Sequence, residues 1–244
     1  MTPILFVHGF PFDHFLWRHQ LEALSRWPCV APDLRGAGGA TPMPPYSMAT
    51  YADDLIALLD RSRIAEAVVC GLSMGGYIAF ELLRRFPKRV RAVVLCNTKA
   101  EADSAEAKQG RDRLAARAQD AGARAVATEL VPKLLARATQ EQRPDIARAV
   151  TEMIERQPVP GIVGALGALR DRPDSRALLP QIGVPALVVA GDDDQIAPAQ
   201  GMREMARAIP GAHFVLIPMA GHMTPLEAPV ALSAALADFL ERVG

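Results

Sequence analysis

The sequence predicts an α/β fold: a mostly parallel sheet of about six strands, with helices on both faces and a helical cap. Three observations in the 244 residues indicate this fold. Short apolar runs alternate with segments in which apolar residues recur at helical spacing. The apolar runs are continuous rather than alternating with polar residues, which is typical of strands buried on both faces. One long segment contains no strand-like run and is therefore expected to be helical.

The expected elements follow one another along most of the chain. Strands are predicted at residues 4–7, 29–31, 67–70, 90–96, 186–190 and 213–217. Connecting helices are predicted at residues 16–26, 48–62, 73–85, 199–208 and 229–243. The pattern Thr50-x-x-Asp53 is similar to a capping box, with Asp in the place of the usual Glu, and predicts the start of the second helix.

The strand-free segment extends from Asn97 to Pro185 and contains no Phe, Tyr or Trp. An insertion between two strands is expected to lie as a helical cap over the carboxyl-terminal edge of the sheet. We therefore predict a core of residues 1–98 and 182–244 and a cap of residues 99–181. The alternative is that the segment contains ordinary crossover helices with no role in substrate binding.

The composition argues against several classes of function. Lys and Arg total 27, as do Asp and Glu, so no net charge favours nucleic acid or an anionic membrane as a partner. No apolar run approaches the ~20 residues that cross a bilayer, and the N-terminus lacks the basic residues of a signal peptide. We therefore expect a cytoplasmic protein. Three cysteines lie in strand-like runs without metal-ligand spacing, which predicts buried free thiols and no metal site.

Ser73 lies between an expected strand and an expected helix, in the pattern Gly-x-Ser-x-Gly of residues 71–75. Such a turn holds the serine in a strained conformation and exposes its hydroxyl above the sheet. Glycines are needed on either side because a Cβ there would keep the strand and helix apart. The pattern alone is common by chance, but its position between strand and helix predicts that Ser73 is a nucleophile.

A serine nucleophile needs a histidine as its base and an acid that orients the histidine. Of the five histidines, His222 follows the last expected strand, at the edge where ligands bind in open α/β sheets. We predict that His222 is the base. The preceding strand leads into Asp192, Asp193 and Asp194, and these residues alone do not decide which one is the acid.

The oxyanion that forms during acyl transfer needs backbone N–H donors. Met74, immediately after the nucleophile, is expected to supply one. The loop after the first strand, His8-Gly9-Phe10-Pro11, is expected to supply the other. Because Pro11 has no N–H, the donor is predicted to be Phe10, and His8 is predicted to organise the loop.

Together these segments resemble the α/β-hydrolase family over essentially the whole chain. The matching segments are His-Gly-Phe at 8–10, Asp-Leu-Arg-Gly-Ala-Gly at 33–38, the serine turn at 71–76, Gly-Asp-Asp-Asp-Gln-Ile-Ala-Pro at 191–198 and Gly-His at 221–222. In this family the acid lies three residues after the glycine and four before the proline, which selects Asp194. The resemblance implies no cofactor, an acyl-enzyme on Ser73, and release of the acid by water that His222 activates.

Arg-Pro-Asp-Ser at 172–175 is similar to small cap-bearing serine carboxylesterases and enol-lactonases. The resemblance therefore implies a carboxylesterase that acts on a small-molecule ester. The family normally begins with an antiparallel hairpin, whereas here the strand before the His-Gly loop begins within the first few residues. We predict that this hairpin is absent and that residues 29–31 form an exposed sheet edge. Such an edge is a candidate surface for a homodimer.

Alternatives to the esterase remain open. Residues 8–11 are also similar to the loop of epoxide hydrolases and dehalogenases, but those enzymes attack with an aspartate where this chain has Ser73. An enol-lactonase, or a cofactor-free perhydrolase that transfers the acyl group to hydrogen peroxide, uses the same triad. A non-enzymatic alternative is a ligand sensor with this fold.

The expected substrate pocket combines apolar residues beside the oxyanion loop with apolar residues of the cap, each of which is equally expected as an ordinary core residue. Besides Phe10 and Met74, they are Phe12, Trp17, Met153, Ile162, Val163 and Leu166. Because few polar groups accompany them, we expect a neutral ester of short or medium chain length.

Overall fold

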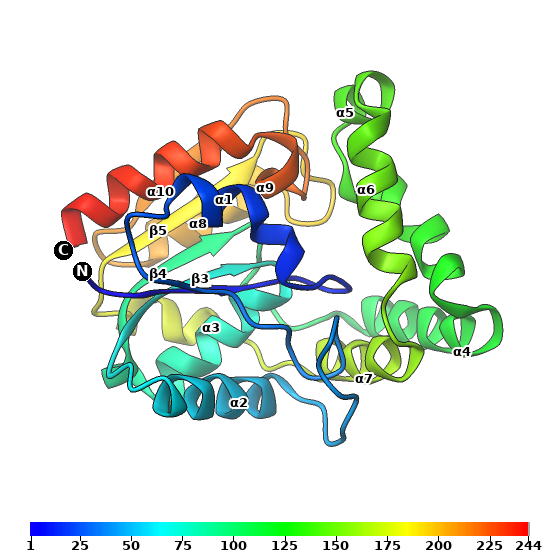
Figure 1. Cartoon of the computed structure of the whole chain (residues 1–244), viewed down its shortest axis with the longest axis horizontal. Helices are drawn as coiled ribbons and strands as arrows, with labels where there is room; N and C mark the ends of the chain where they lie inside the picture. Colours follow the sequence, from blue (N-terminus) through cyan, green and yellow to red (C-terminus); the bar gives the residue numbers. More distant parts are fainter. Residues whose placement is uncertain (244) are drawn as a thin grey trace.

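The computed structural model describes residues 1–243, and within them the chain forms one sheet of six strands. The strands are β1 (Ile4–Val7), β2 (Cys29–Val30), β3 (Ala67–Leu72), β4 (Val90–Cys96), β5 (Ala186–Gly191) and β6 (His213–Ile217). Their order is β2-β1-β3-β4-β5-β6, and each neighbouring pair is parallel (Figure 1). The predicted parallel sheet, its six strands and the edge position of residues 29–30 are confirmed.

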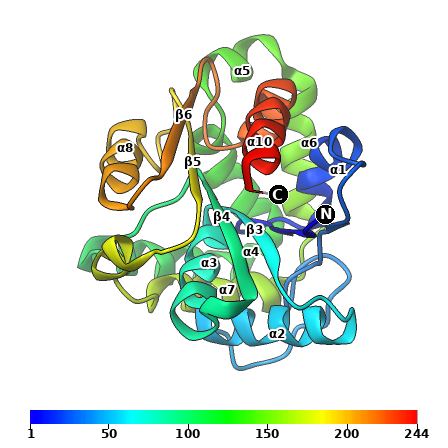
Figure 2. The ribbon, with the colours of Figure 1, turned by 90° about the vertical axis from the view of Figure 1, so that its left-hand side faces the viewer.

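Helices cover both faces of this sheet. They are η1 (His14–Trp17), α1 (Arg18–Ala23), α2 (Met48–Arg61), α3 (Met74–Arg85), η2 (Pro87–Arg89), η3 (Arg176–Gln181), α8 (Ala199–Ala208), α9 (Thr224–Glu227) and α10 (Pro229–Val243). Figure 2 shows α1 and α10 on one face and α3 and α8 on the other. Every residue of β1, β3 and β5 is buried, as expected for continuous apolar strands between two helical layers.

Four helices between β4 and β5 form a separate group, here called the α4–α7 insertion. They are α4 (Ala105–Leu134), α5 (Arg137–Gln142), α6 (Pro144–Glu155) and α7 (Val159–Arg170). α4 packs against α6 and α7 and is interrupted at Gly122, whose φ is +77°. Figure 1 places the insertion beside the carboxyl ends of the strands. The predicted domain boundaries at residues 99 and 181 stay predictions.

The predicted capping box at the start of α2 is wrong. The residue that caps this helix is Ser47, whose hydroxyl accepts a hydrogen bond from the Thr50 N–H at 3.0 Å. Thr50 is therefore the third residue of the helix rather than its cap, and Asp53 instead forms an ion pair with Arg85 at 2.9 Å. The apolar periodicity located the helix correctly, but two neighbouring Ser and Thr residues offered alternative caps.

Two further predictions, made from the composition, concern membrane-spanning helices and the state of the cysteines. Among the residues that the structure describes, no helix combines the length and apolarity required to cross a bilayer. All three cysteines are free thiols; Cys70 and Cys96 are buried, and Cys29 is half-buried beside the sheet edge. The homodimer through the β2 edge stays a prediction.

Candidate active site

Ser73 occupies a strained turn between β3 and α3. Its φ of 55° and ψ of −111° lie in a region that non-glycine residues rarely adopt, at a cost of about 1–3 kcal/mol. Close packing holds the turn, because a Cβ on Gly71 would lie 2.3 Å from the Gly75 carbonyl oxygen. The Thr98 hydroxyl also donates to the Ser73 carbonyl at 2.8 Å. The serine is half-buried, whereas its neighbours on both sides are buried.

His222 and Asp194 form a buried pair at the carboxyl ends of β5 and β6. His222 Nδ1 lies 2.8 Å from Asp194 Oδ2, and the two side chains are 3% and 0% exposed. The same carboxylate accepts backbone N–H groups of Ile196 and Ala197 through its other oxygen. Asp193 instead accepts the Arg137 N–H at the start of α5. Of the three adjacent aspartates, Asp194 is therefore the one that contacts the histidine.

Two residues that the sequence did not single out complete this pair. Asn97 donates its amide N–H groups to Asp194 Oδ2 at 2.9 Å and to the Gly221 carbonyl at 3.1 Å. The side-chain carbonyl oxygen of Asn97 accepts a hydrogen bond from the Thr224 hydroxyl at 2.7 Å. Asn97 directly follows β4 and is fully buried. A polar residue immediately after an apolar strand, at the edge where ligands bind, was the available signal.

The electrostatics of the pair favour an ionised carboxylate. Burial alone would raise the pKa of Asp194, but His222, the Ala197 N–H and the Asn97 amide together lower it below its ordinary value. An ionised Asp194 accepts the proton on His222 Nδ1. This assignment leaves Nε2 as the proton acceptor of the imidazole, as a general base requires.

Ser73 and His222 line the same cavity, together with Phe10 and Ile196. The remaining lining consists of three leucines of the insertion and three polar residues, of which Arg111 also belongs to the insertion. These residues are Tyr77, Lys99, Arg111, Leu130, Leu134 and Leu169. The fold thus brings the predicted nucleophile, the predicted base and one of the two predicted oxyanion residues, Phe10, into one cavity roofed by the α4–α7 insertion.

The two predicted oxyanion donors belong to two segments: Met74 follows Ser73 at the start of α3, and Phe10 lies in the loop after β1. Within residues 1–243, neither the Phe10 N–H nor the Met74 N–H donates to a protein acceptor. Gly9 brings the loop close, because a Cβ there would lie 3.3 Å from the Ser73 Cβ. His8 holds the loop: its Nε2 accepts the Leu34 N–H at 2.9 Å, and its Nδ1 lies 2.9 Å from the Gly9 carbonyl.

The predicted pocket residues are distributed differently. Phe12 and Ile162 line a second cavity, between the oxyanion loop and α7, that Phe10 and Met74 also border. Trp17, Met153 and Leu166 are 2% exposed or less and belong to the core, and Val163 packs against it. None of these six residues lines the cavity that contains Ser73. Tyr77, Lys99 and Arg111, which do line it, were not predicted.

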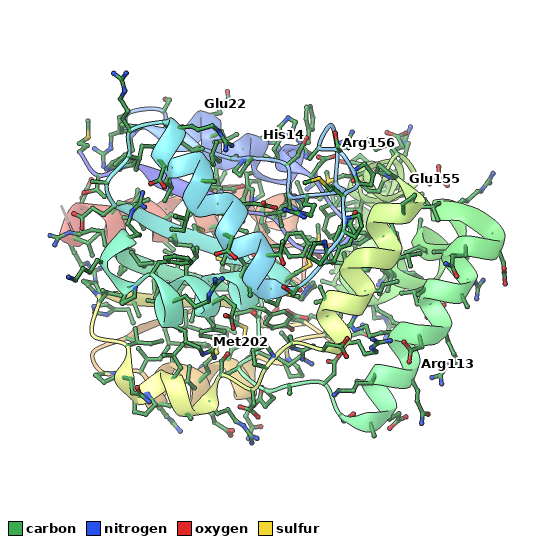
Figure 3. The ribbon with its side chains drawn as sticks, turned by 90° about the horizontal axis from the view of Figure 1, so that it is seen from below. His14, Glu22, Arg113, Glu155, Arg156 and Met202 are labelled. Atoms are coloured by element: carbon green, nitrogen blue, oxygen red, sulfur yellow. The ribbon has the colours of Figure 1, made fainter. Side chains whose placement is uncertain are left out.

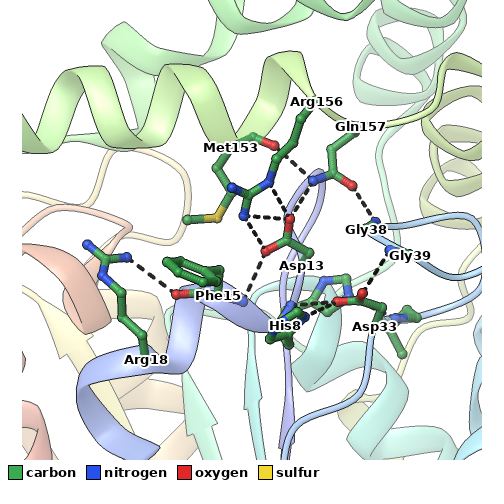
Figure 4. A network of polar contacts seen from close by, with 12 residues as sticks. His8, Asp13, Phe15, Arg18, Asp33, Gly38, Gly39, Met153, Arg156 and Gln157 are labelled. Atoms are coloured by element: carbon green, nitrogen blue, oxygen red, sulfur yellow. Dashed lines mark hydrogen bonds and ion pairs between the residues drawn. The ribbon is translucent and has the colours of Figure 1, made fainter. Parts of the chain in front are cut away.

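A buried carboxylate joins the insertion to the core beside this site (Figure 4). Asp13 accepts hydrogen bonds at 2.8 Å from both Nε and Nη2 of Arg156, and at 2.9 Å from Gln157 Nε2. Gln157 in turn accepts the Gly38 N–H at 2.8 Å. Figure 3 shows Arg156 at the core side of the insertion, near His14. These bonds connect the segment after α6 to the loops that follow β1 and β2.

Asp13, His14 and Asp33 form a group whose ligand atoms lie within 4.8 Å of one another. The oxygens of Asp13 already bind Arg156 and Gln157. Those of Asp33 accept the backbone N–H groups of His14 and Gly39. The carboxylates of this group therefore form structural hydrogen bonds, and the Arg156 guanidinium takes the position beside Asp13 that a metal ion would need.

On its sequence, the chain matches the family model described as alpha/beta hydrolase fold over residues 2–229. A solved thermophilic esterase from Thermogutta terrifontis is 39% identical, with a TM-score of 0.97 over 100% of this chain and 90% of that one. The enol-lactonase from Burkholderia xenovorans LB400 is 31% identical, with a TM-score of 0.91 over 98% and 91%. A Mycobacterium tuberculosis chain assigned as a non-heme bromoperoxidase, BpoC, is 30% identical over 99% of this chain and 94% of that one. The protein belongs to the α/β-hydrolase family.

Proposed function

We propose that this hydrolase cleaves carboxylic esters through an acyl-enzyme on Ser73. The observation that carries the proposal is the buried His222–Asp194 pair, whose histidine shares a cavity with a serine in a strained turn. Relatives named as esterase and enol-lactonase support the same chemistry. A serine hydroxyl is a weak nucleophile, so an oriented base beside it is the requirement that this arrangement meets.

In the proposed reaction, His222 Nε2 takes the hydroxyl proton while Ser73 Oγ attacks the ester carbonyl. Asp194 stabilises the imidazolium that forms, and the N–H groups of Phe10 and Met74 bind the oxyanion. The histidine then protonates the leaving alcohol. In the second half, His222 activates water, which attacks the acyl-enzyme and releases the acid and the free serine.

The test is hydrolysis of p-nitrophenyl esters from two to twelve carbons by the wild type and by Ser73→Ala. We expect the substitution to reduce kcat by at least about a thousandfold, because removal of a triad member typically has effects of that size or larger. Ser25→Ala, an exposed serine outside the site, is the matched control and should retain full activity. Turnover that survives Ser73→Ala would overturn the proposal.

Two additions to this experiment separate the ester hydrolase from related activities. An enol-lactonase would open a lactone with Ser73-dependent turnover, and the Burkholderia relative supports including lactones in the series. The relative named as a bromoperoxidase supports an assay in which hydrogen peroxide competes with water as the acyl acceptor. The Thermogutta esterase was solved with malate bound; malate is a dicarboxylic acid, which supports testing esters of such acids as well.

A further inference from the structure

The wall of the Ser73 cavity carries positive charge from two separate elements. Lys99 follows β4, two residues after Asn97, and Arg111 belongs to α4. Both side chains line the cavity that also contains Ser73 and His222. Neither lies at the serine turn or in the triad, so the chemistry of ester hydrolysis does not by itself account for them.

Arg111 is held in place by a buried carboxylate that it shares. Arg111 Nε lies 3.1 Å from Asp103 Oδ2, and Arg172 Nη1 lies 2.5 Å from Asp103 Oδ1. Arg172 is itself 3% exposed in its side chain and lies over the Tyr77 ring, 4.3 Å from the centroid. One carboxylate therefore neutralises one of two neighbouring guanidinium groups.

Lys99 has no such partner. Within residues 1–243 its ammonium group makes no hydrogen bond and no ion pair with the protein, although the residue is half-buried. Burial, followed by the charges of Arg172 and Arg111, lowers the pKa of Lys99, whereas Asp103 and Glu101 oppose the shift. A partly desolvated ammonium without a counter-ion is costly, and a bound anion would remove that cost.

The charge balance indicates a monoanion. The charges that act most strongly on Lys99 are those of two arginines and two carboxylates, of which Glu101 is exposed. With Lys99 included, three cations face two carboxylates and leave one excess positive charge. Asp194, the acid of the triad, is enclosed by His222, Asn97 and two backbone N–H groups and does not compensate Lys99.

We propose that the substrate is an ester or lactone that carries a carboxylate away from its reacting carbonyl, and that Lys99 and Arg111 bind this carboxylate. Lysine supplies a point charge and arginine supplies directed N–H donors, a combination suited to a carboxylate. A neutral ester of the same length would leave the ammonium unpaired, so the site discriminates against it. This inference rests on the proposed esterase function and replaces the expectation of a neutral substrate.

The experiment compares each monomethyl ester of a linear dicarboxylic acid of four to eight carbons with the methyl ester of the corresponding monocarboxylic acid. A second pair carries the carboxylate on the alcohol side: 4-acetoxybutanoate against butyl acetate. Alkyl esters are used because an aryl half-ester is attacked by its own carboxylate. Hydrolysis is followed by titration of the released acid at constant pH. We expect kcat/KM to be at least about tenfold higher for the carboxylate member of one or more pairs, since a charge-assisted hydrogen bond contributes at least the free energy of a tenfold change.

Lys99→Met tests the residue, and Lys108→Met, an exposed lysine on α4, is the matched control. We expect Lys99→Met to lower kcat/KM on the preferred carboxylate ester by about tenfold or more, mainly through KM, and to change the neutral ester by less than about threefold. Lys99→Arg should restore most of the preference, and Lys108→Met should behave as the wild type. Because Lys99 has no protein partner and its unpaired ammonium is costly, its removal is expected not to lower the melting temperature.

Two failures are distinguishable. Ser73-dependent hydrolysis with equal kcat/KM for charged and neutral partners, or a preference that Lys99→Met leaves intact, would overturn the carboxylate site and keep the esterase. Hydrolysis of both classes that survives Ser73→Ala would overturn the esterase proposal itself.

Discussion

At the scale of single residues, Asn97 connects the acid of the proposed triad to the loop that carries its base. Its amide donates to Asp194 and to the Gly221 carbonyl, one residue before His222. The positive φ of 46° at Asn97 turns the chain out of β4 at this point. One buried side chain thus helps to keep the carboxylate ionised and to position the histidine, without a hydrogen bond to Ser73.

Asn97→Ala is expected to lower kcat by about tenfold to a hundredfold, because a hydrogen bond to a charged group contributes about 1.5–3 kcal/mol. KM should change little, since Asn97 does not line the Ser73 cavity. The Asn97 amide lowers the pKa of Asp194, so its loss raises that pKa and shifts the acidic limb of the kcat–pH profile to higher pH. Steady-state kinetics between pH 4 and 9 measure both effects.

Thr224→Val is the control for this prediction, because it removes only the hydroxyl that donates to Asn97. Its effect on kcat should be smaller than that of Asn97→Ala, with the pH profile nearly unchanged. Equal losses in both variants, with no shift of the acidic limb in either, would assign Asn97 a packing role alone.

At the scale of secondary-structure elements, α7 approaches the loop after β2 through two glycines. A Cβ on Gly161 would lie 1.7 Å from the Gly36 carbonyl oxygen, which no side-chain movement relieves. Gly167 lies six residues later in the same helix, and no atom beyond its own stretch of helix backbone lies within 4 Å of the position of its Cβ. Gly161 and Gly167 therefore belong to the same helix but differ in their surroundings, one crowded and one open, and they form a matched pair for substitution.

Gly161→Ala is expected to destabilise the protein, because the helix and the loop must separate to accommodate the methyl group. Gly167→Ala is expected to stabilise it by about 0.5–1 kcal/mol, the usual gain when alanine replaces glycine inside a helix. Urea unfolding of both variants and the wild type measures the difference. A stabilising Gly161→Ala would show that α7 and this loop do not pack as closely as described.

The sequence located all six strands and most core helices, because parallel strands are continuous apolar runs bounded by helical periods. It also predicted Ser73, Asp194 and His222, since each lies after a strand in a recognisable local pattern, and the family resemblance selected Asp194 from three adjacent aspartates. The cavity walls had no such signature. Lys99 and Arg111 become neighbours only when α4 folds back over the strand ends, and no local pattern records that contact. Likewise, nothing near Asp13 indicates that its partner is Arg156.

At the scale of the whole molecule, the α4–α7 insertion is attached to the core on two sides. On one side, Asp13 binds Arg156 and Gln157. On the other side, Glu227 accepts the N–H groups of Ala136, Gly221 and Met223 at 2.8–3.0 Å. The second attachment includes the backbone that flanks His222. Movement of the insertion is therefore coupled to the active site at that side and independent of the triad at the Asp13 side.

This difference predicts what happens when the Asp13 side is loosened. Arg156→Met removes the charged partner of a buried carboxylate, which costs about 3–5 kcal/mol for a fully buried pair. The Arg156 side chain is 47% exposed, and Asp13 keeps its bonds from Gln157 and the Phe15 N–H. We therefore expect a loss of about 1–2 kcal/mol, confined to the attachment of residues 144–160.

Amide hydrogen exchange measures this loss segment by segment. Exchange of residues 144–160 should accelerate by about fivefold to thirtyfold, the factor that corresponds to 1–2 kcal/mol of local opening. Exchange of the segment around His222 should not change, because Glu227 still holds it. Arg143→Met removes an exposed arginine that directly precedes α6 and pairs with Asp145 in the first turn of that helix, and it should leave both segments unaffected. Acceleration spread evenly over the chain would mean that the insertion opens only with the core, and that the two attachments act as one unit.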